Sequence, residues 1–586
     1  HGEEPTKNKF LRWFNDRLHA MTLAYERFVP YVVGHARVMV AIFLSGIVLL
    51  GVLFVYTPQG FLPAEDQSLL YVLVTLPVQS SLDQTTAAVD KLTQIMRSFP
   101  EVQAVTSGIG FGFANNSSNQ ATLFVTLKPL SERHGLQASA LNMQYQFYQE
   151  FQKRVPGVVA NPANPPAIPG LGSTGGFAIE IEDIDNLGLP TLNKVGNASL
   201  AQAKADTKRL AQVYIPTQLT GPYLVAEFNR AKALAFGVTP TAFFDSLNAS
   251  TGATFVNYFD YGTRSYQVYV QAGAKYRKSP QDLSHVYVAN GNGNMMPVSQ
   301  FLDFSLKTSN VAIMRFNEYN AYEIDASPSS GGSQGGAIAT MADIVKSNLP
   351  KGMGYDWAGI ARQQVSAGPQ TIAVFAMGLL FVFLVLVAQY ESLTTPLVIM
   401  FAVPLALLGA VGGILIRRYS EMATIFIQSK LAGHLVLVPL TSSDIYAQIG
   451  YVMLIGLAAK NAILIVEFAN QLREKGMDTV AAVTHASATR LRPILMTSVA
   501  FILGILPLAF AHGDGAQSRI SLGTAVLGGM LVSTVMNLAI VPVLYVIVID
   551  WSERKKRKPG APIRPEEMPP PPGPPPAPLP GPALSD

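Results

Sequence analysis

A single lysine inside a long apolar segment is the residue of this sequence most able to do chemistry. Lys460 lies near the middle of Ile449–Glu467, which is otherwise almost entirely apolar or small. An ammonium group at bilayer depth costs roughly 3 kcal/mol on insertion scales, and from mid-span its stem cannot easily reach water. Such a charge needs a partner, a water-filled cavity or a proton path. The segment therefore predicts an ion-coupled membrane protein; the alternative is a lysine paired inside a structural helix bundle.

A proton relay needs a second group whose charge state the lysine senses. No aspartate lies in any membrane-length apolar segment of the chain. Glu467, seven residues further on, is either a distant partner or an interfacial carboxylate, and we favour the interfacial role. Arg490 and Thr497 flank the start of the next apolar segment. Their spacing alone favours membrane anchoring by the arginine and backbone capping by the threonine.

Outside the apolar segments, Gly108–Ala114 alternates glycine with phenylalanine. Glycine gives backbone freedom and phenylalanine gives large apolar contacts, which suits a deformable pocket wall or an ordinary glycine-rich hairpin. The stretch lacks the lysine of a phosphate-binding loop. No catalytic triad, zinc-protease motif or cysteine occurs. We therefore expect no enzyme, no metal site and no cofactor other than an ion gradient.

The elements that position these residues follow from composition and hydropathy. The 586 residues are 49% hydrophobic and only 14% charged, and the net charge of +4 does not argue for nucleic acid. Six segments have the length of about 20 apolar residues that crosses a bilayer: 38–56, 371–390, 396–416, 449–468, 493–511 and 526–549. Basic residues lie before the first segment, between the fourth and fifth segments, and after the sixth. The positive-inside rule therefore predicts that these loops are cytoplasmic. Arg417 and Arg418 weakly oppose this orientation.

The polar region between the first and second spans has an α/β pattern. Strands are expected at 69–77, 102–108 and 121–127, with a helix at 81–99 opened by a Ser81–Gln84 capping box. Strand–helix–strand–strand resembles half of a split-βαβ sandwich. A second unit is expected from strand 177–182, helix 200–213 and strand 223–228, resuming at 315–358 after an inserted subdomain. Residues 161–176 are expected to form a loop.

Both ends of the chain have distinct compositions. Aromatic and aliphatic residues repeat at helical spacing over 10–25, which predicts an interfacial helix or a helix that packs in a larger assembly. The stretch 568–582 is rich in proline and predicts a solvated tail.

Two motifs taken together resemble the resistance-nodulation-division (RND) multidrug efflux transporters, in the hydrophobe/amphiphile branch of Gram-negative bacteria. They are Gly456-Leu-Ala-Ala-Lys460-Asn-Ala-Ile-Leu-Ile-Val-Glu467-Phe-Ala and Arg490-Leu-Arg-Pro-Ile-Leu-Met-Thr497-Ser. Further matches lie at Gly60–Gln67, Gly110–Ala114, Gly354–Trp357 and Tyr390–Ser392, so the resemblance covers about residues 7–555.

The resemblance implies an α-helical membrane bundle with a large periplasmic α+β region of ferredoxin-like split-βαβ subdomains. It identifies this chain with the C-terminal half of a twelve-span drug/proton antiporter. The implied segments are a cytoplasmic interfacial helix region (1–37), the first membrane helix (38–56), two porter subdomains (57–178; 179–230 with 311–369), a docking subdomain (231–310), a five-helix bundle (371–549) and a cytoplasmic tail (550–586).

The resemblance also implies roles and partners. Lys460, Arg490 and Thr497 match proton-relay positions, and Lys460 would face a pair of aspartates in the N-terminal half. Residues that match drug-pocket positions are Phe111, Phe113, Phe124, Leu73, Thr75, Phe177 and Glu323. The family works in the bacterial inner membrane as a homotrimer, with a periplasmic adaptor and an outer-membrane channel, and it exports hydrophobic or amphiphilic small molecules.

Some features depart from the family. Residues 417–443 look longer than usual and are partly apolar, which suggests contact with the outer membrane face, and Thr106 replaces an aromatic residue. Export of metal ions or lipids is an alternative, although clustered metal ligands are scarce. Another alternative is a non-transporting, half-length partner or remnant, because half a relay cannot couple protons.

Overall fold

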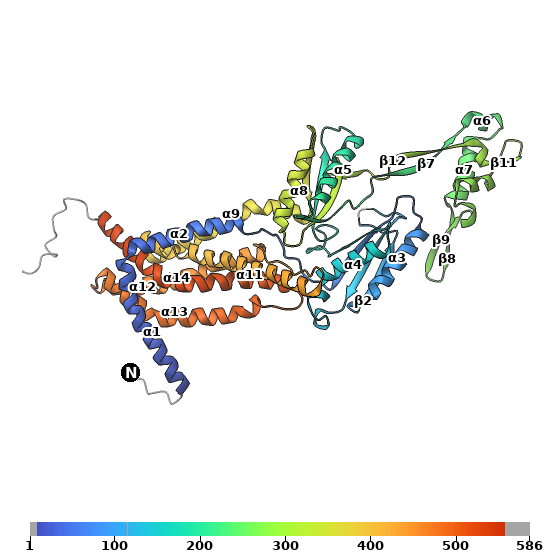
Figure 1. Ribbon diagram of the computed structural model, residues 1–586. Coiled ribbons are helices and arrows are strands. Elements are labelled where there is room, and N and C mark those ends of the chain that lie inside the picture. Colours follow the sequence, from blue (N-terminus) through green and yellow to red (C-terminus); the bar gives the residue numbers. More distant parts are fainter. Residues whose placement is uncertain (1–8, 114, 557–586) are drawn as a thin grey trace, which may run out of the picture. The chain divides into compact units, whose positions relative to one another are not determined.

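A computed structural model describes residues 9–113 and 115–556 of the chain (Figure 1). These residues divide into a helical unit and a mixed helix-and-sheet unit. The helical unit holds residues up to 66, 330–337 and those from 362 on; the mixed unit holds 67–329 and 338–361. Ala114 and the proline-rich tail lie outside the described residues.

The helical unit is organised around its last helix. Its helices are α1 (Lys9–Gly34), α2 (Ala36–Tyr56), α9 (Gly359–Tyr390, from residue 362), α10 (Thr394–Met400), α11 (Val403–Ala432), α12 (Ile445–Glu474), α13 (Thr479–Ala509) and α14 (Ala516–Lys556). Helix α14 packs against α11, α12 and α13 (Figure 1).

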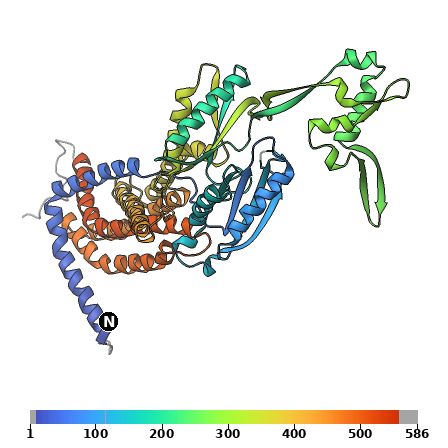
Figure 2. The same ribbon diagram turned by 45° about the vertical axis from the view of Figure 1, so that its right-hand side comes forward.

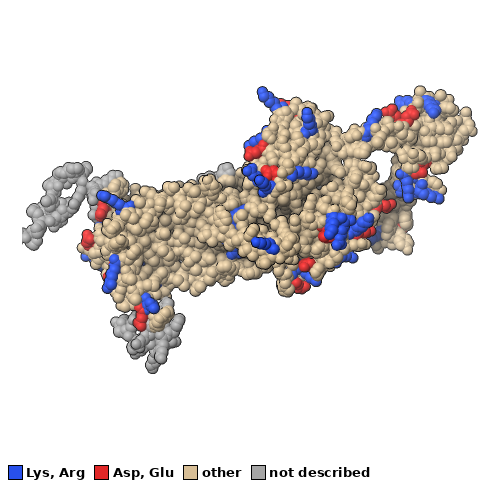
Figure 3. Space-filling model, viewed as in Figure 1, with Lys and Arg blue, Asp and Glu red and all other residues tan. Residues whose placement is uncertain are grey.

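Six helices of the described chain are long and apolar enough to cross a membrane, which confirms the prediction. The most apolar window of α14 is 61% buried, whereas those of α2 and α9 are only 6% buried. Apolar side chains at these two peripheral helices face outward, as expected for lipid contact. In the view of Figure 3, the lengths of these helices present an almost uncharged surface.

Helix α11 continues well past the predicted end of its span at Ile416. Arg418 is buried and donates hydrogen bonds to the carbonyl oxygens of Thr441, Gly331 and Gly332 at 2.7–3.2 Å. Glu421 accepts from Arg417 Nε at 3.0 Å and from the backbone N–H and hydroxyl of Thr441 at 2.6 and 2.8 Å. The arginine pair thus has a local structural use at the end of α11.

Helix α1 has a packed part and an exposed part. Its second half packs in the bundle, because Tyr25 and Val29 are buried against Leu491 of α13. The Tyr25 hydroxyl donates to the carbonyl oxygen of Leu538 at 2.6 Å. Trp13 and Met21 remain exposed. One end of α1 is therefore a packing helix, while the other presents apolar side chains outward.

The first sheet of the mixed unit follows the order β2-β3-β1-β4, and all of its strand pairs are antiparallel. Its elements are β1 (Leu69–Thr75), α3 (Leu82–Arg97), β2 (Val102–Ile109), β3 (Gln120–Leu127), α4 (Ala140–Arg154) and β4 (Val159–Ala163). The predicted Ser81–Gln84 capping box is confirmed at α3. The prediction of a loop from Asn161 was wrong at its start, because β4 is an edge strand that tolerates Pro162.

The second sheet has the order β13-β14-β5-β15, with β6 also pairing with β14. Its elements are β5 (Phe177–Asp183), α5 (Leu189–Ala205), β6 (Leu210–Tyr214), β13 (Met314–Phe316), β14 (Tyr319–Pro328), α8 (Gln334–Asn348) and β15 (Met353–Ala358). The predicted helix 200–213 was wrong. The helix starts eleven residues earlier, at Leu189, because Pro190 suits a first helical turn, and the chain turns into β6 after Asp206.

An inserted segment leaves and returns through the ribbon of β7 (Thr220–Phe228) and β12 (Leu302–Asn310). The strand expected at 223–228 therefore belongs to this ribbon and not to the second sheet. The segment contains α6 (Arg230–Ala235), α7 (Pro240–Thr251), the hairpin β8–β9 (Thr254–Tyr261, Arg264–Val270) and the short pair β10–β11 (Tyr287–Ala289, Met295–Pro297). The segment has a small core of its own, while the hairpin is almost wholly exposed (Figure 2).

Candidate functional site

Helix α12 presents Lys460 on an uncovered face. The helix begins after Asp444, whose carboxylate accepts a hydrogen bond from the N–H of Ala447 at 2.9 Å. Its buried face is packed in the bundle core. The opposite face is a stripe of exposed positions at helical spacing, which we call the Lys460 stripe: Ile449, Val452, Met453, Gly456 and Lys460.

Lys460 has no ion-pair or hydrogen-bond partner in the described part of the chain. Glu467 instead accepts a hydrogen bond from Gln471 at 3.0 Å. The neighbouring Asn461 is buried and donates to the hydroxyl of Ser498 on α13 at 3.4 Å. The lysine is therefore held on a helix whose back is fixed, with its charge directed away from the bundle.

The other two predicted relay residues lie on α13 and form no hydrogen bond with Lys460 in the described structure. The guanidinium carbon of Arg490 lies 4.6 Å from the centre of the Phe468 ring, a cation–π geometry. Arg490 Nε is buried without a hydrogen-bond partner. The Thr497 hydroxyl donates to the carbonyl oxygen of Ile494 at 3.2 Å, as expected for backbone capping.

Four aromatic rings form a second candidate site. They lie on the face of the first sheet that is opposite its buried core. Tyr71 lies between Phe113 and Phe124, with ring centroids 5.4 and 5.3 Å away. Phe111 lies 5.8 Å from Phe113, and both are about 40% exposed. These separations are typical of favourable aromatic pairs. We call the four residues the aromatic patch.

The geometry of the sheet brings further predicted residues to the same face. Leu73 and Thr75 follow Tyr71 at alternate positions of β1, so their side chains point to the side of the patch. The glycine-rich loop is anchored there, because the Thr122 hydroxyl donates to the carbonyl oxygen of Phe111 at 3.1 Å. A Cβ atom at Gly112 would lie 2.6 Å from the backbone carbonyl oxygen of Asn115, which explains the need for glycine at this position.

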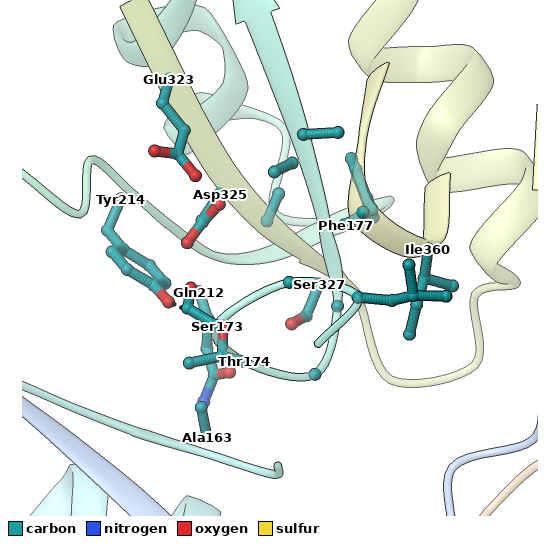
Figure 4. Close-up of a pocket in the computed structure, with 18 residues that line it drawn as sticks. Ala163, Ser173, Thr174, Phe177, Gln212, Tyr214, Glu323, Asp325, Ser327 and Ile360 are labelled. Carbon is teal, nitrogen blue, oxygen red and sulfur yellow. Dashed lines mark hydrogen bonds between the residues drawn. The ribbon is translucent and has the colours of Figure 1, made fainter. Parts of the chain in front are cut away.

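Phe177 and Glu323 belong to the second sheet and line a separate cavity of about 60 Å³ (Figure 4). Phe177 packs against Trp357, with ring centroids 6.1 Å apart. The cavity is also lined by Ala163, which is directly opposite Tyr71 in the first sheet. The cavity and the aromatic patch therefore adjoin at this strand pair.

The sequence of this chain has known relatives. The model of the AcrB/AcrD/AcrF family matches residues 1–549. This chain belongs to that family. It is 35% identical to the multidrug resistance protein MdtF of Escherichia coli K12 over 511 residues, which cover 87% of this chain and 47% of MdtF.

Two further relatives have the same degree of similarity. The multidrug export protein AcrF of Escherichia coli K12 is 35% identical over 92% of this chain and 50% of its own length. The toluene efflux pump membrane transporter TtgB of Pseudomonas putida is 35% identical over 93% of this chain and 50% of its own. The resemblance to RND multidrug efflux transporters is confirmed, and the chain spans about half the length of the curated relatives it matches.

The sequence analysis did not identify three residues of the candidate site, which are Tyr71, Tyr214 and Asp325. Tyr71 could have been found, because alternation along β1 places it on the same face as Leu73. Tyr214 and Asp325 could not. They meet because β6 pairs with β14, and no local pattern in the sequence indicates that pairing.

Proposed function

We propose that the chain forms the C-terminal half of a proton-driven exporter of hydrophobic and amphiphilic drugs in the bacterial inner membrane. The observation that carries this proposal is the Lys460 stripe. A lysine in a span-length helix, without a partner in the described residues, needs a partner from another chain segment to lower the cost of its charge. The family relation supports paired aspartates in an N-terminal half as that partner.

The mixed unit supports a path for amphiphilic molecules. The aromatic patch offers half-exposed rings on a glycine-containing loop, and such surfaces adapt to apolar ligands of different shape. We infer that the two sheets are ferredoxin-like porter subdomains and that the β7–β12 insertion is a docking subdomain. The adjoining cavity extends the proposed path from Phe177 and Glu323 toward Phe113.

Assembly is part of the same proposal. Hairpin β8–β9 exposes many large apolar side chains, including Phe255, Phe259 and Tyr261. Exposed apolar surface of this kind marks interaction sites, which supports a homotrimer. A periplasmic adaptor and an outer-membrane channel would complete the tripartite pump.

The test is efflux of an amphiphilic dye from bacterial cells that co-express this chain with the N-terminal half of a relative. Wild-type chain should lower dye accumulation only when the N-terminal half and a proton gradient are both present. Lys460→Ala should abolish efflux, whereas Lys475→Ala, which removes an exposed lysine at the end of the same helix, should not. The proposal fails if Lys460→Ala exports dye normally at equal expression. Absence of transport from every combination would favour a non-transporting partner.

A further inference from the structure

The arginine pair of α11 marks one end of the helical bundle, and α11 continues beyond it. Arg417 Nη1 donates to the carbonyl oxygen of Ala509, the last residue of α13, at 3.0 Å. Arg418 donates to the carbonyl oxygen of Thr441, in the segment that leads into α12, at 3.2 Å. The two arginines therefore lie level with the ends of two neighbouring membrane helices. The part of α11 that follows them, which we call the α11 extension, lies past the hydrocarbon core of the membrane.

The α11 extension rises too far to be covered by lipid. It is an unbroken helix from Tyr419 to Ala432 and contains neither glycine nor proline, so its fourteen residues rise about 21 Å at about 1.5 Å per residue. The headgroup layer outside the hydrocarbon core is only about 5–8 Å thick on each side. An ordinary helix tilt of about 20° shortens the rise by less than about a tenth. Contact with the membrane face, which the apolar sequence suggests, therefore accounts only for the lower part of the extension.

One side of this helix is exposed and mostly apolar. Its exposed positions follow one another at alternating intervals of three and four residues, and we call them the α11 stripe: Ile416, Tyr419, Ala423, Phe426 and Lys430. The three large apolar side chains of the stripe are 66–73% exposed. Met422 and Ile427 flank the stripe and are also exposed. A continuous apolar surface that extends beyond the membrane marks an interaction site.

Another side of the α11 extension is already occupied by the chain that follows it. Glu421 accepts hydrogen bonds from the backbone N–H and the hydroxyl of Thr441. Two turns further along, the Ser429 hydroxyl accepts from the N–H of Val436 at 2.8 Å and donates to its carbonyl oxygen at 3.3 Å. Val436 is buried. The returning chain is therefore attached to α11 at two heights, which supports the extension and leaves the stripe open.

The spacing of the stripe fits a second helix that runs in the same direction. Intervals of three and four residues produce the a and d positions of a heptad, the pattern by which parallel helices pack. Copies of this chain that share a membrane carry the α11 extension in the same orientation and at the same height, so their stripes can meet in register. The membrane also restricts rotation before the copies meet, which lowers the entropy cost of association. This compensates for a seam of only about two heptads.

The charges along the stripe also favour a copy of this chain as the partner. Lys430 is the only charged residue of the stripe, and the one acidic residue between positions 416 and 431, Glu421, is buried. A single lysine at an a position is a device that fixes the register of a coiled coil, at some cost in stability. Lys430 lies near the open end of the extension, where water and salt screen the repulsion between two lysines. A different partner would need a carboxylate at this height to pair with Lys430.

We propose that the α11 stripe is an interface between copies of this chain, packed as parallel helices outside the membrane. Tyr419, Ala423 and Phe426 lie in the seam, and Met422 and Ile427 close its edges. The inference is independent of the proposed transport function, because contact between copies is measured without transport.

The chain contains no cysteine, so single introduced thiols test the interface directly. In a parallel seam two copies of Ala423 face each other, within the Cα–Cα distance of about 7 Å that a disulfide can bridge. The full chain with Ala423→Cys, in vesicles of phosphatidylethanolamine and phosphatidylglycerol, should therefore form disulfide-linked dimers when copper phenanthroline is added. Gln428→Cys is the matched control, because Gln428 is exposed on the same helix but lies about 140° around it. Its dimers should form at least about tenfold more slowly, since only chance collisions bring these thiols together.

A second substitution tests whether the seam holds the copies together. Phe426→Asp, added to the Ala423→Cys chain, places like charges opposite each other and should slow dimer formation at least about tenfold. Gln428→Asp makes a similar change of charge outside the stripe and should leave the rate unchanged. Melting temperatures equal to that of the parent chain show that the bundle is intact in both variants.

Four results would overturn the inference. Two of them are equal rates for Ala423→Cys and Gln428→Cys, and rapid dimer formation that persists with Phe426→Asp. The third is a fluorescent label at Ala423→Cys that spin-labelled lipid quenches while no dimer forms, which would assign the stripe to lipid. The fourth is a disulfide in bacterial membranes to a protein of different mass in place of the dimer, which would assign the stripe to another partner.

Discussion

Close packing of α14 against α11 leads to the sharpest prediction. A Cβ atom added at Gly409 of α11 would lie 2.5 Å from the carbonyl oxygen of Gly528 and 2.6 Å from Cβ of Val532. Carbon contacts are most favourable at about 3.5–4.0 Å, so the helices would have to separate by about 1 Å. Gly409→Ala therefore tests whether glycine is what allows α14 to reach the centre of the bundle.

The same helix provides the control. A Cβ atom at Gly412 would meet nothing within 4 Å, so Gly412→Ala makes the same chemical change without overpacking. Alanine is favoured over glycine in a helix by up to about 1 kcal/mol, and this gain applies to both variants. Overpacking costs about 1–3 kcal/mol and applies only at Gly409. The difference between the two variants is then about 2 kcal/mol.

Thermal unfolding of the purified chain in detergent, followed by circular dichroism, measures this difference. For a helical unit of about 300 residues, a gap of about 2 kcal/mol corresponds to roughly 3 °C, with Gly409→Ala unfolding at the lower temperature. Equal melting temperatures for the two variants would refute the close approach of α11 and α14. A higher temperature for Gly409→Ala than for Gly412→Ala would do so more strongly.

Three further predictions concern single features. Arg418→Met removes a buried guanidinium that donates to the carbonyl oxygens of Thr441, Gly331 and Gly332, and it should cost about 3 kcal/mol in unfolding free energy. Arg519 also donates to three carbonyl oxygens, but its side chain is exposed, so Arg519→Met should cost much less. Denaturant titration compares the two variants. Burial raises the pKa of Glu180 in the folded chain to about 8, against an ordinary value of 4.5. Between those pH values the folded chain binds more protons than the unfolded chain, so its stability should fall as pH rises. In melting curves recorded across this pH range, Glu180→Gln should reduce this loss of stability. Ser81→Ala removes the cap of α3 and should cost about 1 kcal/mol, seen as faster amide exchange at Gln84; unchanged exchange would contradict the capping role.

The membrane helices were predictable from the sequence because their signal is local. Apolar length alone identified six spans, including the one that carries Lys460. The end of α11 was not predictable, because the helix continues where Arg418 finds distant carbonyl acceptors at Gly331 and Thr441. A hydropathy scale counts an arginine as unfavourable in a membrane and so ends the predicted span there. It contains no information about the hydrogen-bond partners of that arginine.

The candidate site was predictable only where one element carries it. Phe111 and Phe113 are close in sequence, so a single loop brings them together. Asp325 and Tyr214 are separated by more than 100 residues and meet through an antiparallel strand pair with a register shift. A carboxyl group on an alternating strand normally indicates the solvated face of a sheet, so the sequence pattern led away from the cavity.

The bundle gives α12 two unlike faces, and this has a mechanical consequence. On its packed side, a side chain at Gly529 of α14 would collide with Leu454, and one at Gly450 would lie 3.2 Å from Ala525. Interfaces packed this closely deform little and transmit displacement. On its other side, the Lys460 stripe has no packing partner in the described chain. The close contacts of α12 with α14, and of α14 with α11 at Gly528, therefore join three helices into one tightly packed group, and the charge of Lys460 lies on the open side of that group.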